Sequence, residues 1–224
     1  TGEGEISAHQ AVEAVRTGME LKEVEGITFR DESGPIITTP PRKTGDIHDL
    51  PMINWDHFDV ESYINRASYS ANGVKETDAA PRPMPVITAR GCVFKCTFCH
   101  YVFWNDPYRH RRPDHVLNEI RRNIEKHGAN FIAFWDDLSF ASARQAEEFA
   151  DSIIESGLKF TWSAAVRVDV FSRNKLSDDE AVAVAKKMQQ SGCRSVGFSL
   201  ESGDQAIIEM MNKKIKAEDF FQTV

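Results

Sequence analysis

Three of the chain's four cysteines lie within eight residues, in the order Cys92-x3-Cys96-x2-Cys99. A thiolate is a soft metal ligand, and cysteine is scarce enough that so dense a cluster is rarely a packing accident. Three thiolates on one short loop would hold three corners of a four-iron, four-sulfur cluster, which normally takes four cysteines. The fourth, Cys193, is far away in sequence, so the loop would leave one iron open to a substrate or cosubstrate.

Two other uses of these cysteines stay open. Zinc would take Cys92, Cys96, Cys99 and the adjacent His100 as a Cys3His set, although ligands on neighbouring residues fit a tetrahedron poorly. Zinc sites also usually consist of two separated pairs of ligands. Disulfides are disfavoured, because three crowded cysteines cannot pair evenly. The spacing therefore favours an iron–sulfur cluster, with a non-catalytic zinc-binding module as the alternative from another class.

Apolar segments alternate with amphipathic ones after residue 84, and a polar group follows each apolar segment. We expect strands at residues 85–89, 131–135, 160–165 and 195–200. Helices are expected at residues 114–127 and 143–155, then from the capping box Ser177-x-x-Glu180 to Gly192, with another starting near Asp204. This α/β pattern is typical of repeated strand–helix units around a parallel sheet.

The polar groups after the four strands are the three cysteines, Asp136 and Asp137, Arg167 and Asp169, and Glu201 and Ser202. Parallel barrels and open α/β sheets carry their chemistry at the carboxyl ends of the strands. We therefore expect these side chains to meet at one edge of the sheet.

Residues 1–84 have a different character and are expected to form a connector. A helix is predicted from about Ser7, with Ala11, Val12, Val15 and Met19 at helical spacing. Residues 26–39 alternate around a polar turn and predict a β-hairpin. Residues 40–84 hold most of the prolines and predict a long irregular segment, with a short helix near residues 60–65.

Composition excludes some classes of function. The chain has 224 residues and a net charge of −7, which disfavours nucleic acid as a partner. The exception is a basic stretch at residues 109–112, which would neutralise an anionic substrate, contact another domain, or simply form a solvated positive face. No apolar run approaches the roughly 20 residues of a membrane span, and the start does not resemble a signal peptide. The few clustered cysteines favour a reducing cytoplasm.

The cysteine spacing, with the aromatic Phe98 before the last cysteine, resembles the radical S-adenosylmethionine (SAM) superfamily. The resemblance implies a partial (β/α)6 barrel, of which residues 85–224 would be a truncated front part of about four units. It also implies that the three cysteines bind a [4Fe-4S] cluster and that SAM chelates the fourth iron. One electron, from a donor such as flavodoxin or ferredoxin, would then cleave SAM to a 5'-deoxyadenosyl radical that acts on a small-molecule substrate.

The sequence Arg90-Gly91-Cys92 and the Gly-Glu-rich residues 2–5 are similar to the cobalamin-dependent branch of that superfamily. In this branch such a segment follows a cobalamin-binding domain, so cobalamin would be bound by a domain that is not in this chain, and residues 1–84 would connect the two. The branch includes methyltransferases and a magnesium-porphyrin cyclase type. A methylthiotransferase-like enzyme without cobalamin is the alternative within the superfamily.

The resemblance also suggests roles for the SAM-binding residues. Phe98 would pack near the SAM adenine, unless it only packs within its loop. Asp136 and Asp137 stand where many members have Gly-Gly-Glu, so one of them would bind the SAM ammonium. Taken alone, the Asp pair could equally be a helix cap, a magnesium site or a general acid/base pair.

Two later groups complete the expected SAM site. Arg167 would bind the SAM carboxylate, or else form a local salt bridge with Asp169. Glu201 and Ser202 lie in a segment similar to the family's ribose-binding motif, where a carboxylate accepts hydrogen bonds from vicinal hydroxyls. Helix capping is the alternative for Glu201. Cys193 is expected to be a small buried apolar residue, and His100 and Tyr101 to shield the cluster.

Overall fold

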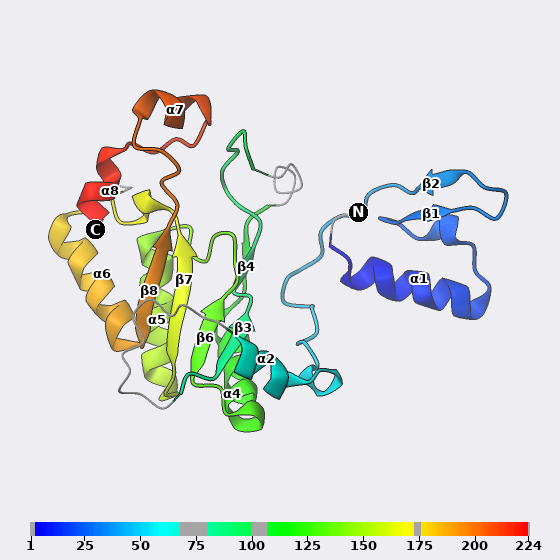
Figure 1. Ribbon diagram of the computed structural model, residues 1–224, viewed down its shortest axis with the longest axis horizontal. Coiled ribbons are helices and arrows are strands. Elements are labelled where there is room, and N and C mark those ends of the chain that lie inside the picture. The colour runs from blue at the N-terminus through cyan, green and yellow to red at the C-terminus, as the bar shows by residue number, and fades with distance from the viewer. Residues whose placement is uncertain (1–2, 68–79, 100–106, 173–175, 224) are drawn as a thin grey trace. The chain divides into compact units, whose positions relative to one another are not determined.

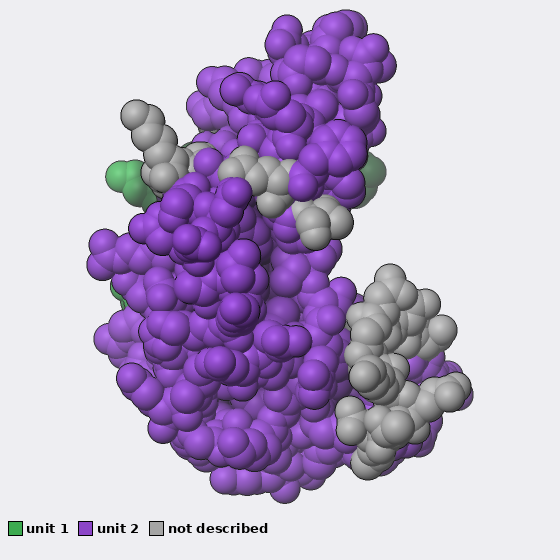
Figure 2. Space-filling view, turned by 90° about the vertical axis from the view of Figure 1, so that its left-hand side faces the viewer, with its two compact units in different colours: residues 1–51 green, residues 52–224 purple. Residues whose placement is uncertain are grey.

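The computed structural model describes residues 3–67, 80–99, 107–172 and 176–223. The chain forms two compact units, Thr1–Pro51 and Met52–Val224, which Figure 2 colours separately. The sequence analysis divided the chain between residues 84 and 85, where the strand–helix pattern begins. The contacts in the structure divide it between residues 51 and 52. Part of the connector therefore packs with the second unit: Val60 and Ile64 of helix α2 (Val60–Arg66) are buried in its core.

The first unit consists of one helix and one hairpin. Helix α1 (Glu5–Thr17) ends at Gly18, whose positive φ of 76° suits glycine. After a 3-10 turn, η1 (Leu21–Glu23), strands β1 (Thr28–Arg30) and β2 (Ile36–Thr38) pair antiparallel, as the alternating pattern predicts. Only Ser7 and Ala14 of α1 are buried, and the Ser7 hydroxyl donates to the Glu25 carbonyl at 2.8 Å.

The second unit is built on a four-stranded parallel sheet in the order β3-β6-β7-β8 (Figure 1). The strands are β3 (Pro83–Val86), β6 (Phe131–Phe134), β7 (Thr161–Val166) and β8 (Cys193–Phe198). Helices α4 (Pro113–His127), α5 (Ala143–Ser156) and α6 (Asp178–Gln190) connect them. The expected repeated strand–helix units are confirmed, and the strand order follows the chain as in a partial barrel.

Local signals account for the helix ends. Gly128 and Gly157, with φ of 64° and 68°, end α4 and α5. Ser177 and Glu180 form the predicted capping box of α6, each side chain bonded to the other residue's backbone N–H. Further short helical elements of the described residues are η2 (Trp55–His57), η3 (Val168–Val170), α7 (Gln205–Met210) and α8 (Glu218–Thr223).

The expected first strand, residues 85–89, differs from the observed one. The parallel strand ends at Val86, and Ala89 and Arg90 form a separate short strand, β4 (Ala89–Arg90). This strand pairs antiparallel with β5 (Arg109–His110) and not with the main sheet. The chain changes partner because Asp136, which follows β6, binds the backbone N–H groups of Thr88 and Ala89.

The two faces of the sheet carry different side chains. Alternate residues of β3, β6 and β7, among them Val86, Phe134 and Trp162, belong to the buried core together with α4, α5 and α6. Ring centroids of Phe134 lie 5.5 Å from Phe149 and 5.3 Å from Trp162. Residues that alternate with them in β6 and β7, such as Ala133, Ser163 and Ala165, are small and point to the other face. Ser195 and Gly197 of β8 do the same, because Val196 and Phe198 pack against the core. Small side chains there leave room at the face where the expected ligand would lie.

Candidate functional site

The cysteine loop, residues 91–99, leaves the sheet after β4. Gly91 opens it with φ of 76°. Cys92, Cys96 and Cys99 are all half-buried and form no disulfide, and the Cys99 N–H donates to the Cys96 carbonyl at 3.1 Å. Burial raises the pKa of the Cys92 thiol, while the Phe94 N–H and the nearby charge of Arg167 lower it. His100 and Tyr101, expected to shield a cluster, lie outside the described residues.

The donor set fits a [4Fe-4S] cluster with an open iron, because three cysteines that form no disulfide lie on one loop. The distances between the three cysteine side chains are considered apart from their residue type. Within the described parts of the chain, no three His, Cys, Asp or Glu side chains are gathered closely enough to hold one metal ion. The structure therefore shows where the loop starts and what holds it, but no assembled ligand geometry for either iron–sulfur or zinc.

A turn at residues 210–214, distant in sequence, holds the cysteine loop. The Thr97 N–H donates to the Met211 carbonyl at 2.9 Å, and the Asn212 side chain donates to the Lys95 carbonyl at 2.8 Å. Asn212 and Lys214 have positive φ of 51° and 52°, so the chain reverses tightly here. The cysteine loop is therefore held by the turn after α7 as well as by the strand that precedes the loop.

The two carboxylates after β6 have different environments. Asp136 is buried: its Oδ1 accepts the N–H groups of Thr88 and Ala89 at 2.8 and 3.0 Å, and its Oδ2 accepts the Thr88 hydroxyl at 2.6 Å. Burial raises the pKa of Asp136, and these hydrogen bonds partly oppose the rise. Asp137 is exposed. The sequence left open which of the two would bind the SAM ammonium. The structure favours Asp137 as the candidate, because Asp136 already holds the segment that leads into the cysteine loop.

Arg167 follows β7 and is buried. Its Nε donates to Oδ1 of Asp169 at 3.0 Å, which is the local salt bridge that the sequence allowed as the alternative to SAM binding. One terminal nitrogen donates to the carbonyls of Lys213 and Lys214 at 2.6 and 3.3 Å. Its guanidinium carbon lies 3.4 Å from the centre of the Phe94 ring, a cation–π contact. Arg167 thus connects the strand end, the turn and the cysteine loop.

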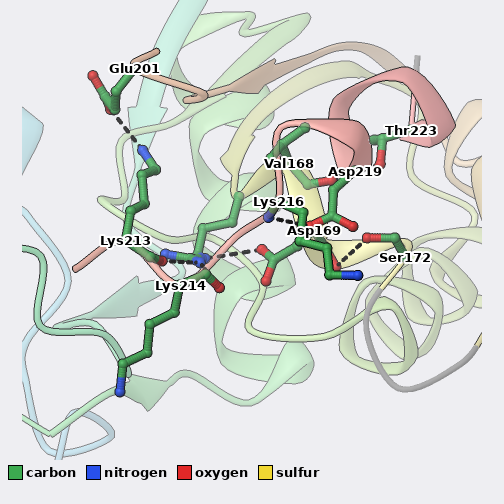
Figure 3. A network of polar contacts seen from close by, with 10 residues as sticks. Val168, Asp169, Ser172, Glu201, Lys213, Lys214, Lys216, Asp219 and Thr223 are labelled. Carbon is green, nitrogen blue, oxygen red and sulfur yellow. Dashed lines mark hydrogen bonds and ion pairs between the residues drawn. The ribbon is translucent and has the colours of Figure 1, made fainter. Parts of the chain in front are cut away.

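Glu201 and Ser202 follow β8 with different partners. Glu201 has a positive φ of 71°, and its Oε1 accepts a hydrogen bond from Nζ of Lys213 at 2.9 Å (Figure 3). Ser202 Oγ accepts the N–H of Asp204 at 3.0 Å. Asp204, and not Glu201, caps α7, since its side chain accepts the N–H groups of Ala206 and Ile207. The helix-capping alternative for Glu201 is therefore wrong, and its carboxylate points to Lys213.

Aromatic residues at this edge fall into two groups. Phe98 is 54% exposed, so its ring is not packed within its own loop, whereas Phe94 lies against Arg167. Trp135 is 65% exposed and immediately precedes the two carboxylates. Because successive residues of an extended chain point to opposite sides, Trp135 and Asp137 lie on the side away from Asp136. Sequence reasoning missed Phe94, Trp135 and Lys213, which have no motif of their own.

The other expected groups are mainly structural. Arg111 of the basic stretch donates to the Ile87 carbonyl and to Glu119, both at 2.7 Å; Glu119 is buried and Arg111 is partly buried. Arg111 is therefore used inside the fold, whereas the side chain of Arg112 is 59% exposed. Tyr108, just before β5, is within hydrogen-bond distance of Ser139 and Gln145, and burial raises its pKa. Burial also raises the pKa of Cys193 to about 12, which agrees with a small inert thiol.

A parallel sheet that carries a three-cysteine loop after its first strand, with acidic and basic residues after the next three, defines an α/β protein of the radical SAM type. The sequence profile of the Radical SAM superfamily matches residues 86–224. The chain therefore belongs to the radical SAM superfamily, whose members use a [4Fe-4S] cluster and SAM and usually need a reductant.

Relatives in sequence are longer proteins. The chain is 30% identical over 228 residues to an uncharacterized methyltransferase, PH0819, of Pyrococcus horikoshii, covering 100% of this chain and 44% of that protein. It is 29% identical to the anaerobic magnesium-protoporphyrin IX monomethyl ester cyclase of Cereibacter sphaeroides, covering 95% of this chain and 32% of that protein. The chain thus spans less than half the length of these relatives.

Solved structures support the fold. The cobalamin-dependent SAM radical enzyme OxsB, with aqua-cobalamin and SAM bound, matches with a TM-score of 0.76 and 18% identity, over 98% of this chain and 30% of that one. This likeness confirms the expected α/β fold of a partial radical SAM barrel. In the described parts of the chain, no helix has the length and apolar character of a membrane span.

Proposed function

We propose that this chain is the cluster- and SAM-binding part of a cobalamin-dependent radical SAM enzyme, with methyl transfer as the favoured reaction. The observation that carries the proposal is the convergence at one sheet edge: the loop with Cys92, Cys96 and Cys99, the exposed Asp137, and Glu201 held by Lys213. Similarity to PH0819 and to OxsB supports the branch and the reaction class.

Each residue has a distinct proposed role. Cys92, Cys96 and Cys99 would hold three irons of a [4Fe-4S] cluster, which when bound supplies the electron that cleaves SAM. Asp137 would accept hydrogen bonds from the SAM ammonium, because it is the exposed member of the Asp pair. Glu201 would accept from the ribose hydroxyls, with Ser202 shaping the turn below it. Phe98 would cover the adenine.

Arg167 and Asp136 have positioning roles in this proposal. Asp136 fixes the backbone of Thr88 and Ala89, three to four residues before the first cysteine. Arg167 holds the loop through Phe94 and places a positive charge near Cys92, where it favours the thiolate that a metal requires. Neither needs to contact SAM, which is a change from the roles that the family resemblance implies.

Partners follow from this chemistry. A low-potential donor such as flavodoxin or ferredoxin would supply the electron, and a small molecule would accept the methyl group. Cobalamin would be bound outside this chain. A reducing cytoplasm suits three half-buried cysteines that form no disulfide. Because one similar protein is a cyclase, another radical reaction on the same cluster and SAM is the second candidate.

The test is anaerobic reconstitution of the protein with iron and sulfide, followed by electron paramagnetic resonance of the reduced sample with and without SAM. A reduced-cluster signal that changes when SAM is added supports the proposal. Substituting serine for each of Cys92, Cys96 and Cys99 should lower iron content, whereas Cys193→Ser, the matched control, should not. Stoichiometric zinc in a colourless protein would instead support the non-catalytic zinc module.

Methyl transfer itself needs a second measurement. If the reaction is methyl transfer, incubating the chain joined to its proposed cobalamin-binding domain with cobalamin and methyl-labelled SAM should transfer the label to cobalamin. SAM cleavage without labelled cobalamin would favour the cyclase-like alternative.

A further inference from the structure

Lys213 is a buried lysine at the centre of the candidate SAM site. It is 3% exposed, and lysine is almost never buried so fully without a charged partner. Its Nζ lies 2.9 Å from Oε1 of Glu201 (Figure 3). The same nitrogen lies 5.6 Å from the centre of the Phe98 ring. The lysine therefore pairs with the residue proposed for the ribose and faces the one proposed for the adenine.

The backbone around Lys213 is also held on both sides. Asn212, its neighbour in the 210–214 turn, donates to the cysteine loop at the Lys95 carbonyl, and Arg167 donates to the carbonyl of Lys213 itself at 2.6 Å. The positive φ of Asn212 and of Lys214 on either side fixes the direction in which Lys213 leaves the turn. A side chain on so constrained a backbone can place its Nζ reproducibly.

Glu201 needs such an anchor. Its φ of 71° places the backbone in the left-handed region that most residues avoid, and its side chain is 38% exposed. A half-exposed glutamate without a partner would sample several rotamers. The charge-assisted bond from Lys213 restricts the carboxylate to one of them and occupies Oε1, and no bond from a described residue reaches Oε2.

We infer that Lys213 is a positioning residue for SAM: it orients Glu201 so that Oε2 accepts from the ribose, and it does so from a turn that is bonded to the cysteine loop. The inference rests on the proposed function, because it assigns the ribose to Glu201. It goes further in naming the residue on which that contact depends. Lys213 does not contact SAM in this scheme.

The experiment compares Lys213→Met with Lys214→Met in the anaerobically reconstituted protein. Lys214 is the matched control, because it is exposed, lies in the same turn and loses the same charge. SAM affinity is measured by equilibrium dialysis, with iron content and melting temperature recorded for every variant. Loss of a hydrogen bond between charged groups predicts about tenfold weaker SAM binding for Lys213→Met, with iron content unchanged. Lys214→Met should bind within about twofold of the wild type.

A thermodynamic cycle with Glu201→Gln tests the mechanism. If Lys213 acts through Glu201, the double variant should bind SAM no more weakly than the weaker single variant. Lys213→Arg, which keeps the charge, should recover most of the affinity. It also keeps the test valid should Lys213→Met lower the melting temperature.

Two results would overturn the inference, and they differ from failure of the proposed function. Wild-type affinity in Lys213→Met would show that Glu201 needs no anchor, and additive losses in the cycle would show that Lys213 acts elsewhere. A wild-type protein that holds the cluster and binds no SAM would instead overturn the proposed function, and the inference with it.

Discussion

Replacing Asp136 should reveal that the two carboxylates after β6 have separate roles. Asp136→Ala would leave the N–H groups of Thr88 and Ala89 without their acceptor, and both residues are almost fully buried. Each unsatisfied buried donor costs about 1–3 kcal/mol. Removing a desolvated charge returns part of that cost. We expect a net loss of about 3 kcal/mol in the free energy of unfolding.

Asp136→Asn should cost much less, about 1 kcal/mol or below, because an amide of the same shape keeps an oxygen at the Oδ1 position. The pH dependence of stability distinguishes the ionisable carboxyl of Asp136 from the neutral amide of Asp136→Asn. Burial raises the pKa of Asp136 above its ordinary value of 3.8, so the folded protein binds this proton more tightly than the unfolded chain does. The contribution of Asp136 to stability is therefore fully present below the unfolded pKa and is lost as pH rises through the folded pKa. The stability of the wild type relative to Asp136→Asn should therefore fall as pH rises from the unfolded pKa to the raised folded pKa.

The assay is thermal or urea unfolding at neutral pH, followed by circular dichroism. For a chain of this length, about 3 kcal/mol corresponds to a melting-temperature decrease of roughly 6–12 °C. Asp137→Ala is the matched control: we expect a change within about 0.5 kcal/mol in stability and clearly weaker SAM binding, because Asp137 is exposed. An Asp136→Ala protein that melts like the wild type would refute the argument, as would an Asp137→Ala protein that is equally destabilised.

Three further substitutions test the fold that carries the site. Gly192→Ala should destabilise by about 3 kcal/mol, because a Cβ there would lie 2.3 Å from the Phe160 carbonyl oxygen at a φ of 100°; denaturant unfolding measures this, and an unchanged midpoint would contradict it. Arg111→Met should cost about 3 kcal/mol by leaving Glu119 buried without its partner, and Arg111→Met combined with Glu119→Met should recover part of that loss in the same assay. Ser177→Ala should cost about 1 kcal/mol through loss of the capping box, while SAM binding measured by dialysis stays unchanged because the cap lies outside the site.

Periodic and local features were predictable from sequence. Helices α4, α5 and α6 agree with expectation to within about a turn, because amphipathic spacing, terminal glycines and the Ser177 cap act over a few residues. The hairpin at β1 and β2 and the short helix α2 were also expected. The first strand was misplaced because its end depends on a carboxylate 48 residues away.

For the candidate site too, some features could be predicted from the sequence and others could not. Cys92, Cys96 and Cys99 stand out because their residue type is rare and their spacing short, and the sequence alone placed Asp136, Asp137, Arg167, Glu201 and Ser202 after parallel strands. The sequence did not show which of these side chains face a ligand. Asp136 and Arg167 have the same residue types as ligand-binding groups, and only their hydrogen-bond partners show that they hold the backbone.

The sequence by itself therefore determined the kind of chemistry, the superfamily and the order of the strand–helix units. Tertiary structure alone decided how the site is held together: that Asp136 anchors the segment before the cysteine loop, that Arg167 spans three segments, and that Lys213 pairs with Glu201. The reason is physical. Ligand type and periodicity are properties of neighbouring residues, whereas a buried charge takes its role from partners that the fold brings to it from distant parts of the chain.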